Sequence, residues 1–239
     1  MSKIVVIDPG HGGKDPGACA NGLKEKDIVL KISKYAKDYL EDGYEGVKVY
    51  LTRSTDVFLE LSERAKFANN KKADLFVSNH INAGGGTGFE SYVYTTINGG
   101  TTEKMRSAVH NEVMTVYKGF RDRGKKKANL AVVRETAMEA MLLEHLFIDT
   151  KKDADFLKLD DNLKAIAKAE ANGIAKALGL KPKTVKKEAP KKEAPKKDIP
   201  KKDGKLSKVQ VGAFADPKNA EKLAAELKKK GYKPFITKE

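Results

Sequence analysis

The sequence is poor in the residues that build several common kinds of site. Its 239 residues include one cysteine, Cys19, which excludes an intramolecular disulfide and any zinc cluster built on cysteine. No apolar run approaches the roughly 18 residues that a membrane-spanning helix needs, so we expect no transmembrane segment. The N-terminus has only a short apolar run before an aspartate, too short for a signal peptide. These absences predict a protein synthesised in the cytoplasm.

Acidic residues are also few relative to basic ones, mainly in the C-terminal part of the chain. The formal net charge is +14. Residues 181–205 carry +7 of it, residues 206–239 carry +4, and residues 1–180 carry only +3. With that modest charge and no tryptophan in the chain, the main domain does not match a nucleic-acid-binding protein, so we expect no nucleic-acid partner. The basic tail is expected to be attracted to polyanions.

Three regions, a domain, a linker and a small C-terminal unit, are predicted from the change in composition along the chain. Hydrophobic residues make up 40% of the sequence, which is enough for a core, and the domain in residues 1–180 is predicted to hold it. Residues 181–205 repeat KKEAP, KKEAP and KKDIP, and proline at every fifth position prevents a helix, so a Lys/Pro-rich linker is predicted. Residues 206–239 are predicted to form one small βαβ unit.

Strands and helices are predicted to alternate in the main domain, which indicates an α/β fold with a largely parallel sheet flanked by helices. Residues 140–143 fit either a strand or a helix, and a strand is favoured because a helix is expected over 160–178. In the tail, strands are expected over 208–214 and 232–237 and a helix over 219–230. The predicted strands of the main domain are residues 3–8, 47–52, 75–78 and 89–95, and its other helices are residues 26–40, 59–69 and 102–116.

Two of the four histidines directly follow predicted buried strands. His11 follows KIVVIDPG, and His80 follows LFVSN. Sites in parallel sheets form where strands end, so these two side chains are expected to lie close together, although a single histidine at such a place is usually structural. An open zinc site needs three protein ligands, and a carboxylate is the natural third in a chain with one cysteine.

Two glutamates are candidates for a zinc hydrolase site. Glu25 lies just before the predicted helix 26–40, where it could be a third ligand or simply a charge favoured at a helix N-terminus. Glu144 ends the apolar run AMLL, an unusual place for a carboxylate without a role, and it could be a catalytic base or a paired structural acid.

At these residues the sequence resembles the zinc-dependent N-acetylmuramoyl-L-alanine amidases of bacterial cell-wall lysis, a family that includes endolysins and autolysins. The resemblance covers most of residues 1–180. It rests on six segments: IVVIDPGHGGKDPGA (4–18), NGLKEKDIVL (21–30), VYLTRSTD (49–56), ADLFVSNHINA (73–83), GFESYVY (88–94) and VVRETAMEAMLLEHLFI (132–148).

The resemblance implies a role for each candidate. His11, Glu25 and His80 would bind zinc, and Glu144 would be the catalytic glutamate. The implied reaction is hydrolysis, by zinc-activated water, of the amide between the lactyl group of N-acetylmuramic acid and the L-alanine of the peptidoglycan stem peptide. The chain departs from the family pattern at Glu139, where the family has proline, and at Leu146, where it has glycine.

The tail resembles half of a sporulation-related repeat (SPOR) domain, which binds peptidoglycan. The segments VQVGAF and NAEKLAAELKKKGY carry this likeness. The complete fold has two such units, so the tail is expected to bind weakly or to self-associate. Its charge predicts attraction to anionic wall polymers.

The combined expectation is an enzyme that acts on the cell wall after release from the cytoplasm, either a phage endolysin or a host lytic enzyme. Asn82 and Arg134 are candidate substrate contacts, and 125–127 is expected to be a solvated loop. The rival interpretation is a wall-binding protein that has kept the fold and lost turnover.

Overall fold

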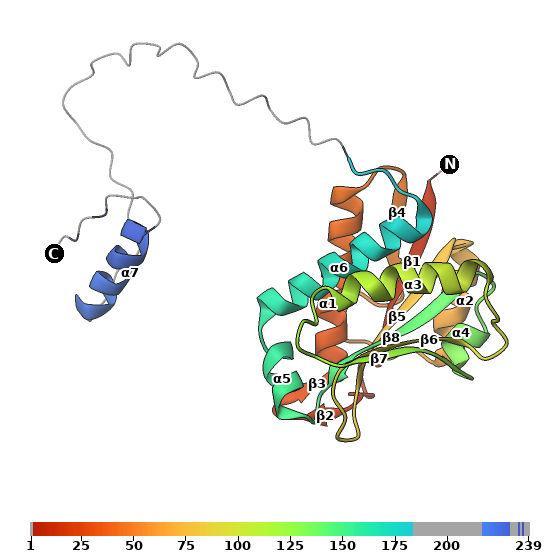
Figure 1. The fold of residues 1–239 in the computed structure, drawn as a ribbon, viewed down its shortest axis with the longest axis horizontal. Coiled ribbons are helices and arrows are strands. Elements are labelled where there is room, and N and C mark those ends of the chain that lie inside the picture. Colours follow the sequence, from red (N-terminus) through yellow and green to blue (C-terminus); the bar gives the residue numbers. More distant parts are fainter. Residues whose placement is uncertain (1, 184–216, 230–233, 235, 237–239) are drawn as a thin grey trace, which may run out of the picture. The chain divides into compact units, whose positions relative to one another are not determined.

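The computed structural model describes residues 2–183, 217–229, 234 and 236, and the contacts within it divide the chain into two units, 1–185 and 186–239 (Figure 1). The first unit holds a six-stranded sheet and a two-stranded one. The strands are β1 Lys3–Pro9, β2 Cys19–Ala20, β3 Leu23–Lys24, β4 Val47–Leu51, β5 Leu75–Asn82, β6 Phe89–Tyr94, β7 Asp122–Ala128 and β8 Glu139–Phe147. The helices of this unit are α1 Glu25–Gly43, α2 Leu61–Lys71, α3 Gly100–Met114, α4 Ala131–Arg134, α5 Lys151–Leu157 and α6 Asp160–Leu178.

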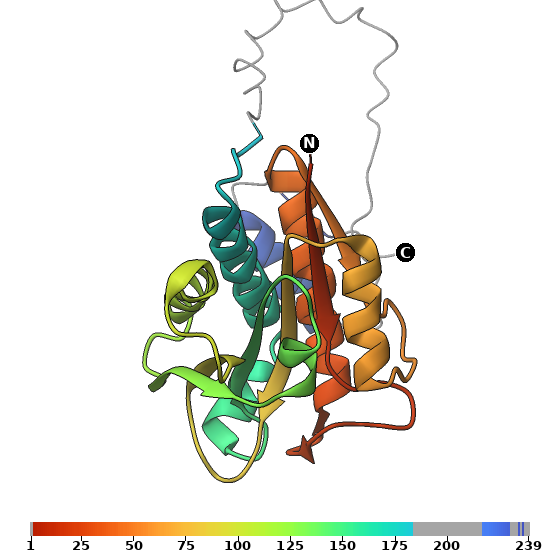
Figure 2. The same cartoon turned by 90° about the vertical axis from the view of Figure 1, so that its right-hand side faces the viewer.

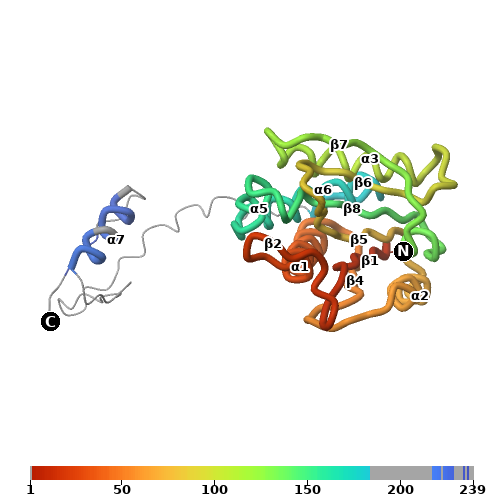
Figure 3. Tube along the Cα trace, turned by 90° about the horizontal axis from the view of Figure 1, so that it is seen from below, coloured from red at the N-terminus to blue at the C-terminus, as the bar shows by residue number. Residues whose placement is uncertain are grey.

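The six-stranded sheet has the order β4-β1-β5-β8-β6-β7, which Figure 3 shows from one edge of the sheet to the other. β4, β1, β5 and β8 are mutually parallel, β6 is antiparallel to β8, and β7 is parallel to β6. The expected α/β fold with a largely parallel sheet is therefore confirmed. The central strands are nearly continuous apolar runs, as strands covered on both faces require.

The two faces of the sheet are covered unequally. The larger core cluster joins β-strand residues such as Ile7, Val77 and Leu143 to α1, α3 and α6. The smaller cluster lies on the other face, where Val6 and Phe76 pack with Ala68 of α2 and Val132 of α4. Figure 2 shows α2 on one side of the strands and α3 and α6 on the other. Because α4 has only four residues, this second face leaves room for a site.

One expectation about local structure is correct and another is wrong. Residues 140–143 lie in β8, so the favoured strand is correct. The solvated loop expected at 125–127 is wrong, because these residues belong to β7, which pairs with β6 at the edge of the sheet. A run of lysines is a common feature of edge strands, where it discourages pairing with another chain.

The structure describes little of the predicted linker and tail. Residues 181–183, expected in the linker, belong to the first unit: Pro182 forms a β-bridge with Tyr44, and the Lys183 N–H donates to the Gly43 carbonyl over 2.8 Å. The rest of the linker, 184–205, and the strands expected over 208–214 and 232–237 lie outside the described residues, apart from 234 and 236. The helix expected over 219–230 is present as α7 Pro217–Lys229. None of the described helices has the length and apolar character to cross a membrane.

Candidate active site

The candidate residues converge at one end of the sheet. His11 follows β1, His80 lies near the end of β5, and Glu144 lies beside it in β8, in direct register with His80. Glu25 is the first residue of α1 and is 3% exposed. Parallel strands have their carboxyl ends at the same edge of the sheet. The four residues therefore lie close together although they are distant in sequence.

Three donor atoms face one another. His11 Nε2 and His80 Nδ1 each lie 3.0 Å from Glu25 Oε1, and they lie 3.2 Å from each other. Ligands on a tetrahedral zinc with bonds of 2.0–2.1 Å are about 3.3 Å apart. The three atoms therefore already have nearly the spacing of three ligands on one ion. Within the described residues, His11, Glu25 and His80 are the one set of at least three such side chains close enough to hold a metal.

Glu25 is fixed by hydrogen bonds on both of its oxygens. Oε1 accepts the Ile81 N–H over 2.9 Å, and Oε2 accepts the Ala18 N–H over 2.9 Å. Burial alone would raise the pKa of Glu25, but the hydrogen bonds and charges of His11 and His80 hold that pKa well below its usual range. Glu25 is thus an ionised carboxylate, the form that binds a metal.

His11 is oriented from its other ring nitrogen. Its Nδ1 lies 2.8 Å from Asp15 Oδ2, the carboxylate–histidine arrangement that leaves Nε2 free to act as a ligand. The backbone of His11 has a positive φ of 60°, a strained conformation for a residue with a side chain.

Two buried arginines hold the backbone around His11. Arg64 donates from Nη2 to the His11 carbonyl over 2.7 Å and from Nη1 to Asp8 Oδ1 over 2.9 Å. Arg53 donates to the carbonyls of Pro9 and Gly10 over 2.9 and 2.7 Å. These contacts compensate for the strain at His11, which identifies Arg53 and Arg64 as residues that position the site.

Glu144 has opposite surroundings to those of Glu25. Its Oε2 is buried and makes no hydrogen bond with the described part of the protein. Desolvation by burial raises the pKa of Glu144 to about 7, in spite of the nearby charge of His80. A carboxyl that is unpaired and titrates near neutral pH is suited to accept and return a proton.

The donor set and the space around it fit a zinc ion. Two imidazoles and a carboxylate are a common three-ligand set of catalytic zinc. The surrounding glycines allow the approach: a Cβ on Gly10 would lie 2.3 Å from the His80 ring, and one on Gly17 would lie 2.6 Å from Glu25 Oε2. A larger residue at either position would push a candidate ligand aside.

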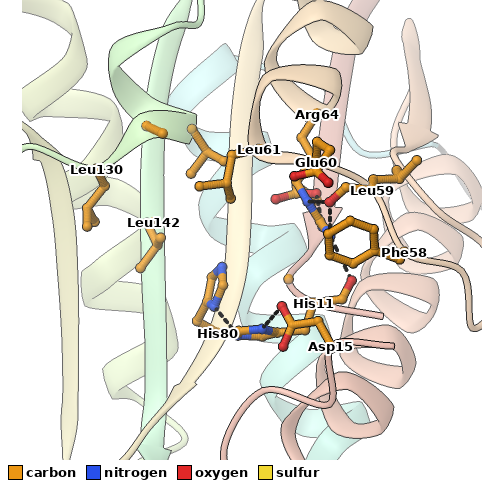
Figure 4. Close-up of a pocket in the computed structure, with 14 residues that line it drawn as sticks. His11, Asp15, Phe58, Leu59, Glu60, Leu61, Arg64, His80, Leu130 and Leu142 are labelled. Atoms are coloured by element: carbon orange, nitrogen blue, oxygen red, sulfur yellow. Dashed lines mark hydrogen bonds and ion pairs between the residues drawn. The ribbon is translucent and has the colours of Figure 1, made fainter. Parts of the chain in front are cut away.

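A cavity of about 370 Å³ opens beside this set on the face covered by α2 and α4 (Figure 4). His11 and His80 lie at its floor, and Leu142 and Arg64 come from the strand and helix beside it. The other labelled side chains are mainly apolar: Phe58, Leu59, Leu61 and Leu130. The site is therefore open to a substrate that has both apolar and polar parts.

The two candidate substrate contacts lie in different places. Asn82 Nδ2 donates to Glu90 Oε1 over 2.7 Å, and Glu90 is the register partner of Glu144 on β6. Arg134 is at the end of α4, where it donates to Asn129 over 2.6 Å and to Glu135 over 2.8 Å. The structure thus places Asn82 against Glu90, the neighbour of Glu144, and pairs Arg134 with residues close to it in sequence.

The two positions that depart from the family pattern both belong to β8, Leu146 two residues after Glu144 and Glu139 at the start of the strand. Leu146 has φ of 64°, the left-handed conformation that favours glycine, and it is fully buried. Glu139 begins β8 and accepts a hydrogen bond from Thr102. The backbone therefore keeps at Leu146 the conformation expected of a glycine, and the expected place of Glu144 is unchanged.

Sequence reasoning missed several supporting residues. Asp15 and Arg53 lie inside segments that carry the resemblance, and an acid four residues after His11 is itself a signal for a histidine partner. Arg64 and Arg123 carry no such signal, because their partners are distant in sequence.

Two sequence families match the chain. A family described as N-acetylmuramoyl-L-alanine amidase matches residues 5–176, and the SPOR domain matches residues 203–239. The chain belongs to the N-acetylmuramoyl-L-alanine amidase family. This confirms the resemblance drawn from the six segments and from the tail.

Individual relatives are similar over most of the chain. The sporulation-specific N-acetylmuramoyl-L-alanine amidase of Bacillus subtilis (strain 168) is 42% identical over 232 residues, which cover 97% of this chain and 83% of that protein. An endolysin of Bacillus phage SPP1 is 53% identical over 188 residues, which cover 77% of this chain and 69% of the endolysin.

The solved catalytic domain of the amidase CwlV from Bacillus (Paenibacillus) polymyxa var. colistinus has the same fold. It superposes with a TM-score of 0.70 and 35% identity, over 75% of this chain and 99% of that domain. The likeness covers the unit that contains His11, Glu25, His80 and Glu144.

Proposed function

We propose that the chain is a zinc-dependent N-acetylmuramoyl-L-alanine amidase in which His11, Glu25 and His80 hold the metal and Glu144 is the general base. The observation that carries this proposal is that two carboxylates lie beside His80 and differ in their hydrogen-bond partners. Glu25 is ionised and shares its Oε1 with two imidazoles, whereas Glu144 is in register with His80 and has an unpaired oxygen.

Each residue of the site would have a separate role. When bound, zinc would supply Lewis acidity, which polarises a carbonyl and lowers the pKa of water. His11 and His80 would present neutral imidazole nitrogens to it, with Asp15 holding the ring of His11. Glu144 would accept a proton from the attacking water and deliver it to the amine that leaves. Its pKa of about 7 suits both transfers near neutral pH.

The substrate follows from the family. The amide would be the one between the lactyl group of N-acetylmuramic acid and the L-alanine of the stem peptide in peptidoglycan. The mainly apolar cavity beside the metal set can accommodate a sugar or peptide next to the scissile bond.

A chelator experiment tests the metal proposal. Purified protein should hold about one zinc per chain, as expected for a three-ligand catalytic site. Removing the metal should stop release of stem peptides from purified walls, and added zinc should restore it. His80→Ala should lose the metal, whereas Lys168→Ala, an exposed change on α6, should keep it. Full activity after complete metal removal would contradict the proposal. A protein that binds zinc and walls but releases no peptide would instead be the non-catalytic wall binder.

The basic tail is proposed to attach the enzyme to walls. Residues 186–239 include the segment that matches the SPOR domain, and the C-terminal part of the chain from 181 carries +11 of the net charge. Attraction between exposed charges weakens as salt shortens the screening length from about 10 Å at 0.1 M to about 3 Å at 1 M.

Sedimentation with purified walls tests this role. Full-length protein should bind better than a chain ending at residue 185 at low salt, and the advantage should shrink strongly at 1 M salt. An advantage that high salt leaves unchanged would indicate specific glycan recognition in place of charge attraction. Equal binding at low salt would remove the tail from wall attachment.

A further inference from the structure

A cluster of charged and polar side chains lies on the β6–β7 side of Glu144. Its centre is Glu90, which is 2% exposed although it is a carboxylate. Glu90 on β6 and Glu144 on β8 are direct partners of an antiparallel pair. Side chains of such partners point to the same face, and their Cα atoms are about 4.5–5.5 Å apart. The cluster therefore adjoins the proposed base.

Four side chains surround Glu90, and with it they make up what we call the Glu90 cluster. Oε1 accepts from Asn82 Nδ2 over 2.7 Å and from the Tyr92 hydroxyl over 3.0 Å. Oε2 accepts from Arg123 Nε over 2.8 Å and from Lys126 Nζ. Burial opposes ionisation of Glu90, but these donors outweigh it and lower its pKa. Glu90 is therefore a fixed negative charge that anchors two cations.

Arg123 is held on two sides and open on a third. Nε is bonded to Glu90, and the guanidinium lies over the ring of Phe147, 4.7 Å from its centre. Neither Nη1 nor Nη2 makes a hydrogen bond to a described residue, and the side chain is 25% exposed. A planar guanidinium fixed in this way presents its two Nη groups as a preformed fork, which matches a carboxylate.

The cluster also has one positive charge in excess. Glu90 contributes −1, and Arg123 and Lys126 each contribute +1. Tyr92 stays neutral, since burial and its hydrogen bond to Glu90 raise its pKa to about 12. An anion that reached Arg123 would thus complete the charge balance of a partly buried group, beside the place where the amide is cut.

We propose that the Nη edge of Arg123 binds a free carboxylate of the stem peptide, about two residues beyond the scissile amide, and so selects substrates in which that carboxylate is not amidated. This inference rests on the proposed amidase function. Two strand spacings separate β8 from β7, about 9.5 Å. Two extended residues span roughly 7 Å, and the arginine side chain covers the remainder.

The test compares two soluble substrates that differ in one group. They are N-acetylmuramoyl tripeptides with either D-isoglutamate or D-isoglutamine as the second residue, incubated with the full chain. Wild-type protein should cleave the acid with a kcat/KM about 10- to 100-fold above that of the amide, the range for a hydrogen bond to a charged group. Most of the difference should lie in KM.

The variants separate recognition from folding. Arg123→Ala should lower kcat/KM for the acid to about the level of the amide and so abolish the preference, and Arg123→Lys should keep part of the preference because it retains the charge without the fork. Lys125→Ala is the matched control, since Lys125 is on the same strand but in register with Ser91, whose side chain points to the opposite face.

Three results would overturn the proposal: no preference in wild type, an equal loss on both substrates in Arg123→Ala, or wall digestion by wild type with cleavage of neither soluble substrate. An equal loss would mean that Arg123 only anchors Glu90. If wild-type protein released no peptide from walls either, the proposed function itself would have failed, which distinguishes the two failures.

Discussion

Glu25 and Glu144 lie beside the same histidine, and they have opposite electrostatic surroundings. Glu25 accepts two backbone N–H groups and faces two imidazoles, which hold its pKa well below the usual range. Glu144 has an unpaired buried oxygen and a pKa raised to about 7. Residue type and burial alone do not separate their roles. The partners that each carboxylate has in the fold separate a metal ligand from a base.

A glutamate on the other face of the sheet extends the comparison. Glu170 on α6 is fully buried, and among the described residues only Asn79 donates hydrogen bonds to it, at 3.2 Å to each oxygen. Burial raises the pKa of Glu170 to about 8, and the Asn79 hydrogen bond only partly opposes this. It therefore resembles Glu144 in its surroundings, but it lies on the opposite face, away from the cavity.

The largest expected effect on stability comes from Glu170→Gln. The folded-state pKa of Glu170 is above its unfolded value, so wild-type protein loses unfolding free energy as pH rises from about 4.5 to about 8. The variant lacks this loss, while its side-chain oxygen can still accept from Asn79. The difference in unfolding free energy between variant and wild type should grow by roughly 1.4 kcal/mol per pH unit between pH 5.5 and 7.5.

Denaturant unfolding of both proteins at several pH values measures this difference. Other titrating groups are shared and cancel in the comparison. A difference that stayed constant over this pH range would show that Glu170 is ionised in the folded protein, and burial would then not be what raises the pKa of these carboxyls.

A smaller effect is expected from Asp15→Asn, which changes a partner of the metal-binding set that includes Glu25. Asp15 holds Nδ1 of His11, and loss of such a partner usually lowers metal affinity about 10- to 100-fold. Competition for zinc with a chromophoric chelator measures the affinity. Asp155→Asn, a change at a half-exposed position of α5 that is paired with Lys151 and Lys158, is the control and should have wild-type affinity. Equal affinity of the Asp15 variant would remove Asp15 from support of the site.

The smallest effect on stability is expected from substitutions of Leu146, which is two residues after Glu144. Glycine is usually less stable than alanine by about 0.5–1 kcal/mol, but at a positive φ the order should reverse. Both Leu146→Ala and Leu146→Gly lose a buried side chain, and only the glycine relieves the conformation at φ 64°. Thermal unfolding should therefore rank Leu146→Gly above Leu146→Ala. The opposite rank would mean that Leu146 is not strained.

The sequence allowed the sheet and the proximity of His11 and His80 to be predicted, because buried parallel strands are continuous apolar runs and both histidines directly follow such runs. Glu25 and Glu144 were candidates from their places before a helix and after an apolar run, and the family resemblance implied their roles. It did not allow prediction of what makes the two carboxylates differ, since the partners of Glu25 come from residues 18 and 81 as well as both histidines. The lysines of β7 hide the alternation of an edge strand, so the sequence predicts a loop over 125–127. Arg123 carries no signal in the sequence because its partner Glu90 is 33 residues away.

Zinc content and activity of Glu25→Gln and Glu144→Gln, measured side by side, test the central claim most directly. Both substitutions remove one charge and keep the shape of the side chain. Glu25→Gln should lose both zinc and activity, because an amide is a poor metal ligand. Glu144→Gln should keep about one zinc per chain and lose activity by on the order of 10²–10⁴, the usual cost of removing a general base. Loss of zinc in Glu144→Gln, or near-normal peptide release by it, would contradict the account.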